Sequence, residues 1–133
     1  MVIPFIRYDD APAALEWLTK AFGFEQKIVV PGDGNTIAHA ELTYGRGAVM
    51  IGSTRKDDDF ALKSPRELGA STQGIYVVVE DPDSHHDRAT AAGAEIVYGL
   101  VDQDYGSREY GARDLEGHLW TFGTYDPFAE GEG

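Results

Sequence analysis

Apolar residues recur at helical spacing in the segment DDAPAALEWLTKAFGFE, residues 9–25. Asp10 stands before the first apolar position and Gly23 after the last, as an N-cap residue and a C-terminal glycine do. The pattern predicts a three-turn helix with one buried face. The apolar stripe consists of Ala11, Leu15, Leu18 and Phe22.

The segment EDPDSHHDRATAAGAE, residues 80–95, predicts a second helix by the same features. Asp81 is the expected N-cap, Pro82 takes the first helical position, and Gly93 ends the helix. The packed stripe carries His85, Ala89 and Ala92. Each helix follows a short β-rich run, VIPFIRY in one case and GIYVVVE in the other.

The two halves of the chain match each other at a constant offset of 70 residues. GFE at 23–25 corresponds to GAE at 93–95, and GAVMI at 47–51 corresponds to GHLWT at 117–121. A constant offset over such separated points indicates a duplicated unit. The turn signals PGDGN and YGRG in the first copy, and DLEG in the second, complete a strand, helix, strand, strand, strand order in each copy.

These boundaries predict one domain of two modules, about 1–53 and 74–126, joined by a charged linker or flap over 54–73, with a tail over 127–133. The helix of a βαβββ module covers one face of its sheet, so the other face must meet a second sheet, a partner chain or a ligand. We therefore predict an α+β fold in which the two modules form a curved mixed sheet around a cleft, with the helices on the outer face. A ligand is expected in the cleft.

The segment AHAELTY places His39 and Glu41 two positions apart on a predicted strand, so both side chains point to one face. If YGRG closes a tight hairpin with Tyr44 opposite Ala48, Glu41 lies opposite Ile51 and points into the cleft. A slip of one residue would reverse the faces. The face under the helix then carries Ala38, Ala40 and Leu42.

Charge and composition narrow the classes of partner. The 133 residues include 23 acidic and 11 basic side chains, a net charge of -12, which argues against nucleic acid or an anionic membrane and favours a cationic ligand. The absence of cysteine excludes disulfides, thiolate metal sites and a cysteine nucleophile. Without a secretory leader pattern or a membrane-spanning apolar run, a cytoplasmic protein is expected.

The paired βαβββ pattern, the opening IPFIRYDDAPAALEWLTKAFGFE and the closing ARDLEGHLWTFGTY resemble the glyoxalase, bleomycin-resistance and extradiol dioxygenase superfamily, the vicinal oxygen chelate fold. The resemblance covers nearly the whole chain except the linker and the tail. It implies the fold, while the function stays open, because the same scaffold carries enzymes and antibiotic-sequestering proteins.

In metal-dependent members of that superfamily, ligands lie on the first and last strands of each half. The resemblance places Ile3 and Gly74 at the first-strand positions, and Ile51 and Thr121 at the last-strand positions. None of these four is a His, Asp or Glu, so the family metal ligands are lacking. A protein without a metal cofactor is therefore expected.

His39 and Glu41 then have three interpretations. They are two ligands of a displaced divalent metal site, with Glu109, the counterpart of His39 at the offset of 70, as the third. They are a hydrogen-bonded pair on a half-exposed strand. Alternatively, they are polar anchors inside a ligand pocket.

Two functions follow from these alternatives. The first is a small-molecule-binding protein that resembles the bleomycin-resistance branch and sequesters a cationic or aromatic drug. The second is a glyoxalase-like enzyme of lyase, isomerase or dioxygenase type, which uses a displaced metal or acid–base chemistry by His39 and Glu41. The expected pocket has Phe5, Ile51, Tyr76 and Leu119 as walls, and His39, Glu41, Glu109 and Thr121 as polar contacts.

An open sheet edge and an uncovered sheet face favour a homodimer, as does the resemblance, because members of that superfamily commonly pair. In such a dimer, Trp17 or Tyr125 is expected to cover the cleft.

Overall fold

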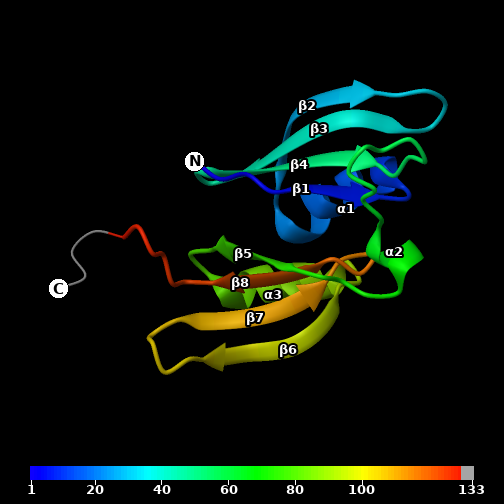
Figure 1. Cartoon of the computed structure of the whole chain (residues 1–133). Coiled ribbons are helices and arrows are strands. Elements are labelled where there is room, and N and C mark those ends of the chain that lie inside the picture. The colour runs from blue at the N-terminus through cyan, green and yellow to red at the C-terminus, as the bar shows by residue number, and fades with distance from the viewer. Residues whose placement is uncertain (130–133) are drawn as a thin grey trace.

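The structure is a computed structural model that describes residues 1–129; residues 130–133 of the expected tail lie outside the described residues. It confirms the α+β class and the repeated βαβββ order (Figure 1). The first module comprises β1 (Phe5–Tyr8), α1 (Ala11–Phe22), β2 (Glu25–Pro31), β3 (Ile37–Tyr44) and β4 (Gly47–Ser53). After α2 (Pro65–Leu68), the second comprises β5 (Gly74–Val78), α3 (Pro82–Ala91), β6 (Glu95–Asp102), β7 (Arg108–Arg113) and β8 (Leu119–Gly123).

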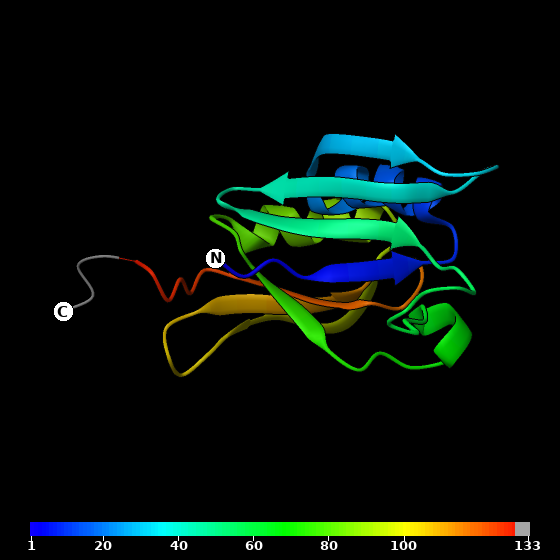
Figure 2. The same ribbon diagram turned by 45° about the horizontal axis from the view of Figure 1, so that its top comes forward.

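The strands form two separate four-stranded sheets, where the sequence analysis expected one curved sheet. Their orders are β1-β4-β3-β2 and β5-β8-β7-β6. The first strand of each module runs parallel to the last, and the other pairs are antiparallel. Figure 2 shows the first sheet as four strands side by side, from β2 in cyan to β1 in blue.

Both long helices begin where their local sequence signals predict, and α1 also ends at the expected glycine, whereas the C-cap of α3 is Ala92 and not Gly93. The Asp10 side chain accepts a hydrogen bond from the Ala13 amide at the start of α1, and Gly23 ends this helix in the left-handed conformation at φ 82°. In α3, the Asp81 side chain accepts from the Ser84 amide. No helix within residues 1–129 combines the length and the hydropathy needed to cross a membrane.

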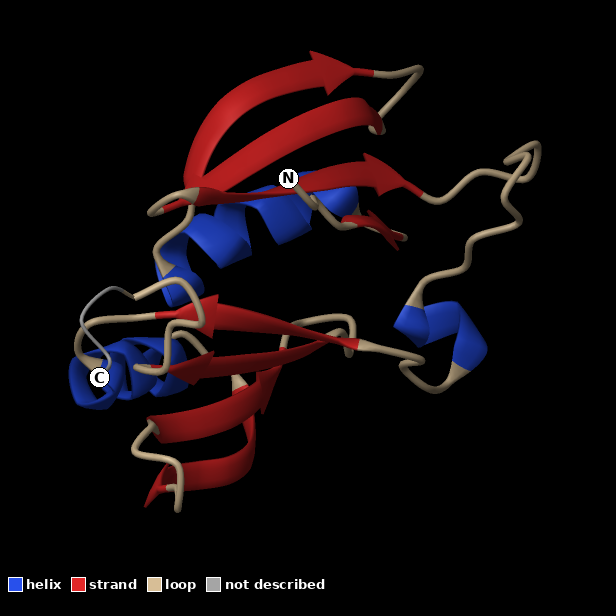
Figure 3. Cartoon of the chain, turned by 60° about the vertical axis from the view of Figure 1, so that its left-hand side comes forward, coloured by secondary structure: helices blue, strands red, loops and turns tan. Residues whose placement is uncertain are grey.

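The helix-covered faces of the two modules meet in one hydrophobic core. Phe22 of α1 packs against Trp120 and Phe122 of β8, with ring centroids 5.6 and 4.6 Å apart. Trp17 donates from its indole Nε1 to the Ala92 carbonyl at 2.9 Å, so it joins the two helices. The expectation that Trp17 covers the cleft is therefore wrong. In Figure 3, α1 lies below the first sheet, on the side of the second module.

Because the core takes the helix side of both sheets, the other side of each sheet has no cover of similar extent among residues 1–129. We call these sides the first and second open faces. The first carries Phe5, Ile28, Val30, His39, Glu41 and Met50, and the second carries Tyr76, Val78, Glu109, Gly111, Leu119 and Thr121.

The hairpin between β3 and β4 is tighter than expected. Tyr44 pairs with Gly47, so the expected pairing of Tyr44 with Ala48 is wrong, and Glu41 pairs with Met50. A two-residue turn at Gly45, with φ 55°, accommodates this register.

In the observed register of β3 and β4, Ile51 does not face the cleft. Ile51 pairs with Ala40, and both lie in the hydrophobic core, with Ile51 only 2 % exposed. Ala38 is exposed, which corrects the expectation that it packs under the helix, and Ile37 is buried in its place. The physical reason is a register shift between Val30 and Pro31 on β2, which disturbs the alternation at this end of β3.

The offset between equivalent positions is not constant along the chain. Two residues connect β3 to β4, whereas five connect β7 to β8. Equivalent positions differ by 70 between β3 and β7, but by 71 between β4 and β8 and between β1 and β5. Thr121 pairs with Gly111, as Met50 pairs with Glu41. The counterpart of Thr121 is therefore Met50, and the expected equivalence with Ile51 is corrected.

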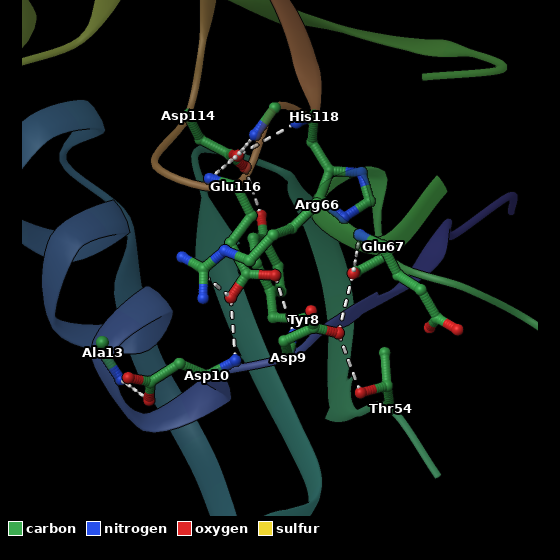
Figure 4. Close-up of polar contacts among 12 residues, drawn as sticks. Tyr8, Asp9, Asp10, Ala13, Thr54, Arg66, Glu67, Asp114, Glu116 and His118 are labelled. Carbon is green, nitrogen blue, oxygen red and sulfur yellow. Dashed lines mark hydrogen bonds and ion pairs between the residues drawn. The ribbon is translucent and has the colours of Figure 1, made fainter. Parts of the chain in front are cut away.

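The loop after β7, residues 114–118, joins the modules through a buried carboxylate (Figure 4). Asp114 accepts hydrogen bonds at Oδ2 from the Tyr8 hydroxyl at 2.5 Å and from Trp120 Nε1 at 3.0 Å. Its Oδ1 accepts from three backbone amides of its own loop. Burial and the neighbouring Asp114 carboxylate raise the pKa of Tyr8 well above its usual value, so the hydroxyl remains a donor.

A second carboxylate of this loop holds the chain just before α1. Glu116 accepts from the Asp9 amide at 2.7 Å and from the Asp10 amide at 2.8 Å. The linker joins the same cluster, because the Ser64 hydroxyl donates to Asp9 at 2.7 Å and Arg66 lies 3.7 Å from Glu116. The linker contains the short helix α2, which the sequence analysis did not identify, although Ser64 before Pro65 and Glu67 is an N-terminal helix signal.

His85 connects the modules inside the core, as its position on the packed stripe of α3 predicts. Its Nδ1 lies 2.5 Å from the Tyr110 hydroxyl and its Nε2 lies 2.8 Å from the Phe22 carbonyl. The carbonyl can only accept, so Nε2 donates and the Tyr110 hydroxyl donates to Nδ1 of a neutral ring. Burial lowers the pKa of His85, which keeps this arrangement neutral.

We expect His85 to make stability fall as the pH drops below its usual pKa of 6.5. The unfolded chain binds a proton there that the folded chain does not, so the free energy of unfolding decreases by at most about 1.4 kcal/mol per pH unit until the lowered pKa is reached. Urea unfolding of the wild type and of His85→Gln between pH 7.5 and 5 measures this, and the variant should lack this part of the decline.

Tyr110→Phe is the matched control, because it removes the hydroxyl and keeps the buried imidazole. It should lose about 1–3 kcal/mol at pH 7 from the unpaired Nδ1 and keep the decline below pH 6.5. Equal pH profiles for the wild type and His85→Gln would contradict the assignment.

Candidate functional site

The structure divides the expected pocket residues between two surfaces. Phe5, His39 and Glu41 lie on the first open face, whereas Tyr76, Glu109, Leu119 and Thr121 lie on the second. Ile51 lies on neither face, because it is buried in the core. The pocket therefore cannot consist of all the expected residues within one chain.

The second open face contains an open concavity of about 590 Å³, which is in the size range of small-molecule sites. It contains the expected residues Tyr76, Glu109 and Thr121. Three further tyrosines complete its aromatic lining: Tyr98, Tyr105 and Tyr125.

Glu109 contributes to the lining of this concavity and is almost fully buried. It is only 4 % exposed, and its two carboxylate oxygens lie 2.9 and 2.8 Å from the Tyr105 hydroxyl, which donates to them. Gln103 Nε2 lies 3.4 Å from the same carboxylate. The hydrogen bond to Glu109 raises the pKa of Tyr105 to about 12, so Tyr105 is a neutral donor at neutral pH.

Hydrogen bonds and ring contacts hold the other tyrosines of the lining in place. The Tyr76 hydroxyl donates to the Tyr125 carbonyl at 2.9 Å. The Tyr105 and Tyr125 rings stand nearly perpendicular, at 84°, with centroids 6.1 Å apart. Burial raises the pKa of Tyr76, which favours its neutral form. Tyr98 lies against the backbone of Gly111.

Two glycines make room for this lining. A Cβ atom on Gly111 would lie 2.5 Å from the Tyr98 ring. A Cβ atom on Gly123 would lie 2.6 Å from the Tyr76 hydroxyl and 2.7 Å from Cγ of Glu109. Any other residue at these positions would displace a wall of the concavity.

On the first open face, His39 Nε2 lies 2.9 Å from Glu41 Oε2. Their side chains are 42 % and 26 % exposed, so this pair is accessible to a ligand. The linker covers a neighbouring part of the face, where Phe60 packs on Phe5 with ring centroids 5.6 Å apart and Arg7 pairs with Asp58 at 3.3 Å.

The residues do not fit a metal centre of the family kind. The open-face residues that pair across the first and last strands are Phe5 with Met50 and Tyr76 with Thr121, which corrects the expected positions Ile3, Gly74 and Ile51. These residues supply no carboxylate or imidazole either. The displaced site is not assembled either, because Glu109 lies on the other sheet from His39 and Glu41. Within residues 1–129, no cluster of three or more His, Asp or Glu side chains is suited to a metal ion.

Sequence reasoning missed Tyr98 and Tyr105 for different reasons. Register shifts flank Tyr98 on β6, so simple alternation does not indicate its direction. Tyr105 lies in the turn between β6 and β7, and no strand pattern applies to it. Tyr125, which was expected to cover the cleft, lines the concavity.

Residues 2–122 match the family model of the Glyoxalase/Bleomycin resistance protein/Dioxygenase superfamily. The uncharacterized protein Mb0911c of Mycobacterium bovis is 32% identical over 126 residues, which cover 90% of this chain and 80% of that protein.

Two solved structures share the fold. TioX from Micromonospora sp. ML1 has a TM-score of 0.74 and 38% identity, and the match covers 92% of this chain and 94% of TioX. The bleomycin-binding protein from bleomycin-producing Streptomyces verticillus, solved with copper(II)-bleomycin, has a TM-score of 0.64 and 20% identity. Its match covers 94% of this chain and 95% of that chain.

Gly111→Ala tests the close packing beneath Tyr98. The added methyl group must displace the Tyr98 ring, so we expect the free energy of unfolding to fall by about 1–3 kcal/mol in a urea titration. Gly99→Ala on β6 is the control, because a Cβ atom there meets nothing within 4 Å. It should stay within about 0.5 kcal/mol of the wild type. Equal effects of the two substitutions would contradict the described position of Tyr98.

Proposed function

Because this chain belongs to the Glyoxalase/Bleomycin resistance protein/Dioxygenase superfamily, we propose that it is a small-molecule-binding protein of the drug-sequestering kind. The observation that carries this proposal is the concavity on the second open face, lined by four tyrosines and Glu109. Such a lining offers stacking surfaces and few polar contacts, as binding pockets do.

The chemistry of the strand positions supports binding without a resident metal. Phe5, Met50, Tyr76 and Thr121 are the open-face residues that pair across the first and last strands, and they suit apolar or aromatic contacts. The related fold of the bleomycin-binding protein shows that such a scaffold accommodates a large drug in another protein. For this chain, the ligand class is a cationic or aromatic compound.

A second candidate function rests on the pair His39 and Glu41. A histidine 2.9 Å from a carboxylate on an accessible face has the components of a general acid–base pair. This glyoxalase-like enzyme would convert its ligand, whereas a sequestering protein would return it unchanged. The two functions therefore differ in the fate of the bound compound.

We also propose a homodimer formed through the open faces. Ile28 and Val30 on the first face, and Val78 on the second, are exposed apolar side chains on the helix-free side of each sheet. Exposed apolar surface of this kind is typical of an interface. A second copy of the chain would contact these apolar side chains in a twofold arrangement.

A binding screen tests the main proposal. Metal-free and copper-loaded bleomycin and other cationic aromatic antibiotics are titrated by thermal shift and calorimetry. We expect saturable stabilisation, of about 2.7 kcal/mol at a ligand concentration of 100 times the dissociation constant. Mass spectrometry should recover the compound unchanged, and the purified protein should retain less than one metal ion per chain.

The result that would overturn sequestration is conversion of the compound with loss of turnover in His39→Ala, or stoichiometric metal required for binding. A panel without any bound compound would equally contradict the proposal. Ile51→Val is the control variant, because Ile51 lies in the core and not on an open face; it should bind as the wild type does.

Analytical ultracentrifugation tests the homodimer. At micromolar concentration, the wild type should sediment at twice the monomer mass. Val30→Glu places a charge on the first open face and should raise the dimer dissociation constant by about tenfold or more. Circular dichroism verifies that the variant is folded. A wild type that sediments as a monomer would contradict the dimer.

A further inference from the structure

The carboxylate of Glu109 is buried among neutral groups. Its hydrogen-bond donors are the Tyr105 hydroxyl and the Gln103 amide, which satisfy the oxygens but carry no positive charge. None of the ion pairs among residues 1–129 includes Glu109. A buried carboxylate without a cationic partner is costly, and a bound cation would offset that cost.

The aromatic walls around this carboxylate suit the same type of ligand. The four tyrosine side chains are between 36 % and 59 % exposed, so their rings are partly free to contact a ligand. The perpendicular pair Tyr105 and Tyr125 forms a corner, and Tyr98 is fixed over Gly111. The negative faces of aromatic rings attract ammonium groups, most strongly where water is excluded.

The composition of the concavity disfavours other charged ligands. Its lining contains no Lys, Arg or His, so an anion would meet Glu109 without compensation. A metal ion would find one carboxylate and neutral hydroxyls, too few ligands for a stable site. The net charge of -12 also attracts cations over longer distances.

Resting on the proposed binding function, we infer that the concavity formed by Tyr76, Tyr98, Tyr105, Tyr125 and Glu109 is a binding site for the protonated or quaternary amine of an organic cation. The rings surround the alkylated nitrogen, and Glu109 neutralises its charge from below. The remainder of the ligand extends along the second open face towards Leu119. This assignment gives the two modules different tasks, because the equivalent position of Glu109 on the first face is His39.

Three small probes of nearly equal shape test the charge preference. Choline is the cation, 3,3-dimethylbutan-1-ol is its neutral carbon analogue, and 3,3-dimethylbutanoate is the anion. Each is titrated into isotopically labelled protein and followed by amide chemical shifts. We expect choline to shift amides around Tyr98, Glu109 and Tyr125, with a dissociation constant about tenfold or more below that of the neutral analogue. The anion should not bind.

Three single-residue variants test whether choline binding depends on the residues of the concavity. Glu109→Gln keeps an acceptor for Tyr105 and removes the charge, and Tyr98→Leu removes one ring; each should weaken choline binding by about fivefold or more. Glu16→Gln on α1 changes the net charge equally, outside the concavity, and should leave the affinity unchanged. The amide spectra also show whether each variant is folded.

Equal binding of choline and its neutral analogue would overturn the inference, as would shifts confined to other parts of the protein or an equal loss in Glu16→Gln. If drugs bind in the screen but choline shows no charge preference, the inference fails and the sequestering function stands. If neither drugs nor choline bind, both fail.

Discussion

The arrangement of the two modules depends on one buried negative charge. Asp114 accepts hydrogen bonds from the hydroxyl of Tyr8 in the first module, from the indole of Trp120 in its own module, and from three amides of its own loop. A carboxylate surrounded by so many donors tolerates burial, and its geometry defines where β1 lies relative to β8. Glu116 of the same loop holds the start of α1. The loop thereby fixes the orientation of one module relative to the other. In this orientation the aromatic core lies between the modules and the open faces point away from the core.

The candidate functional residues are therefore divided between the two open faces. Equivalent strand positions carry His39 on the first face and Glu109 on the second, but their surroundings differ. The linker lies beside the first face through Phe60 and Asp58, which contact Phe5 and Arg7, while tyrosines surround Glu109 on the second. The same scaffold thereby presents a half-exposed polar pair and an aromatic concavity of about 590 Å³ that can accommodate part of a ligand.

Local signals in the sequence were sufficient for the helices and for the repeat. Asp10, Gly23, Asp81 and Pro82 act within one turn of the chain, so their effect is readable without the fold. The face of Ile51 required the exact turn length, and an error of one residue was enough to misplace it. Tyr98 and Ala38 lie near register shifts, which the alternation of residues does not indicate. The partners of Asp114 lie up to 106 positions away and follow only from the packed structure.

The connections between the last two strands make the two modules structurally unequal. The longer connection forms the loop that carries Asp114 and Glu116, whereas the first module has a two-residue turn at the equivalent place. Two copies of the first module in tandem would thus reproduce the sheets and helices but lack the carboxylates that orient one against the other. The two modules therefore have different roles at their junction. The second module supplies the carboxylates, and the first module supplies the hydrogen-bond donors that they bind.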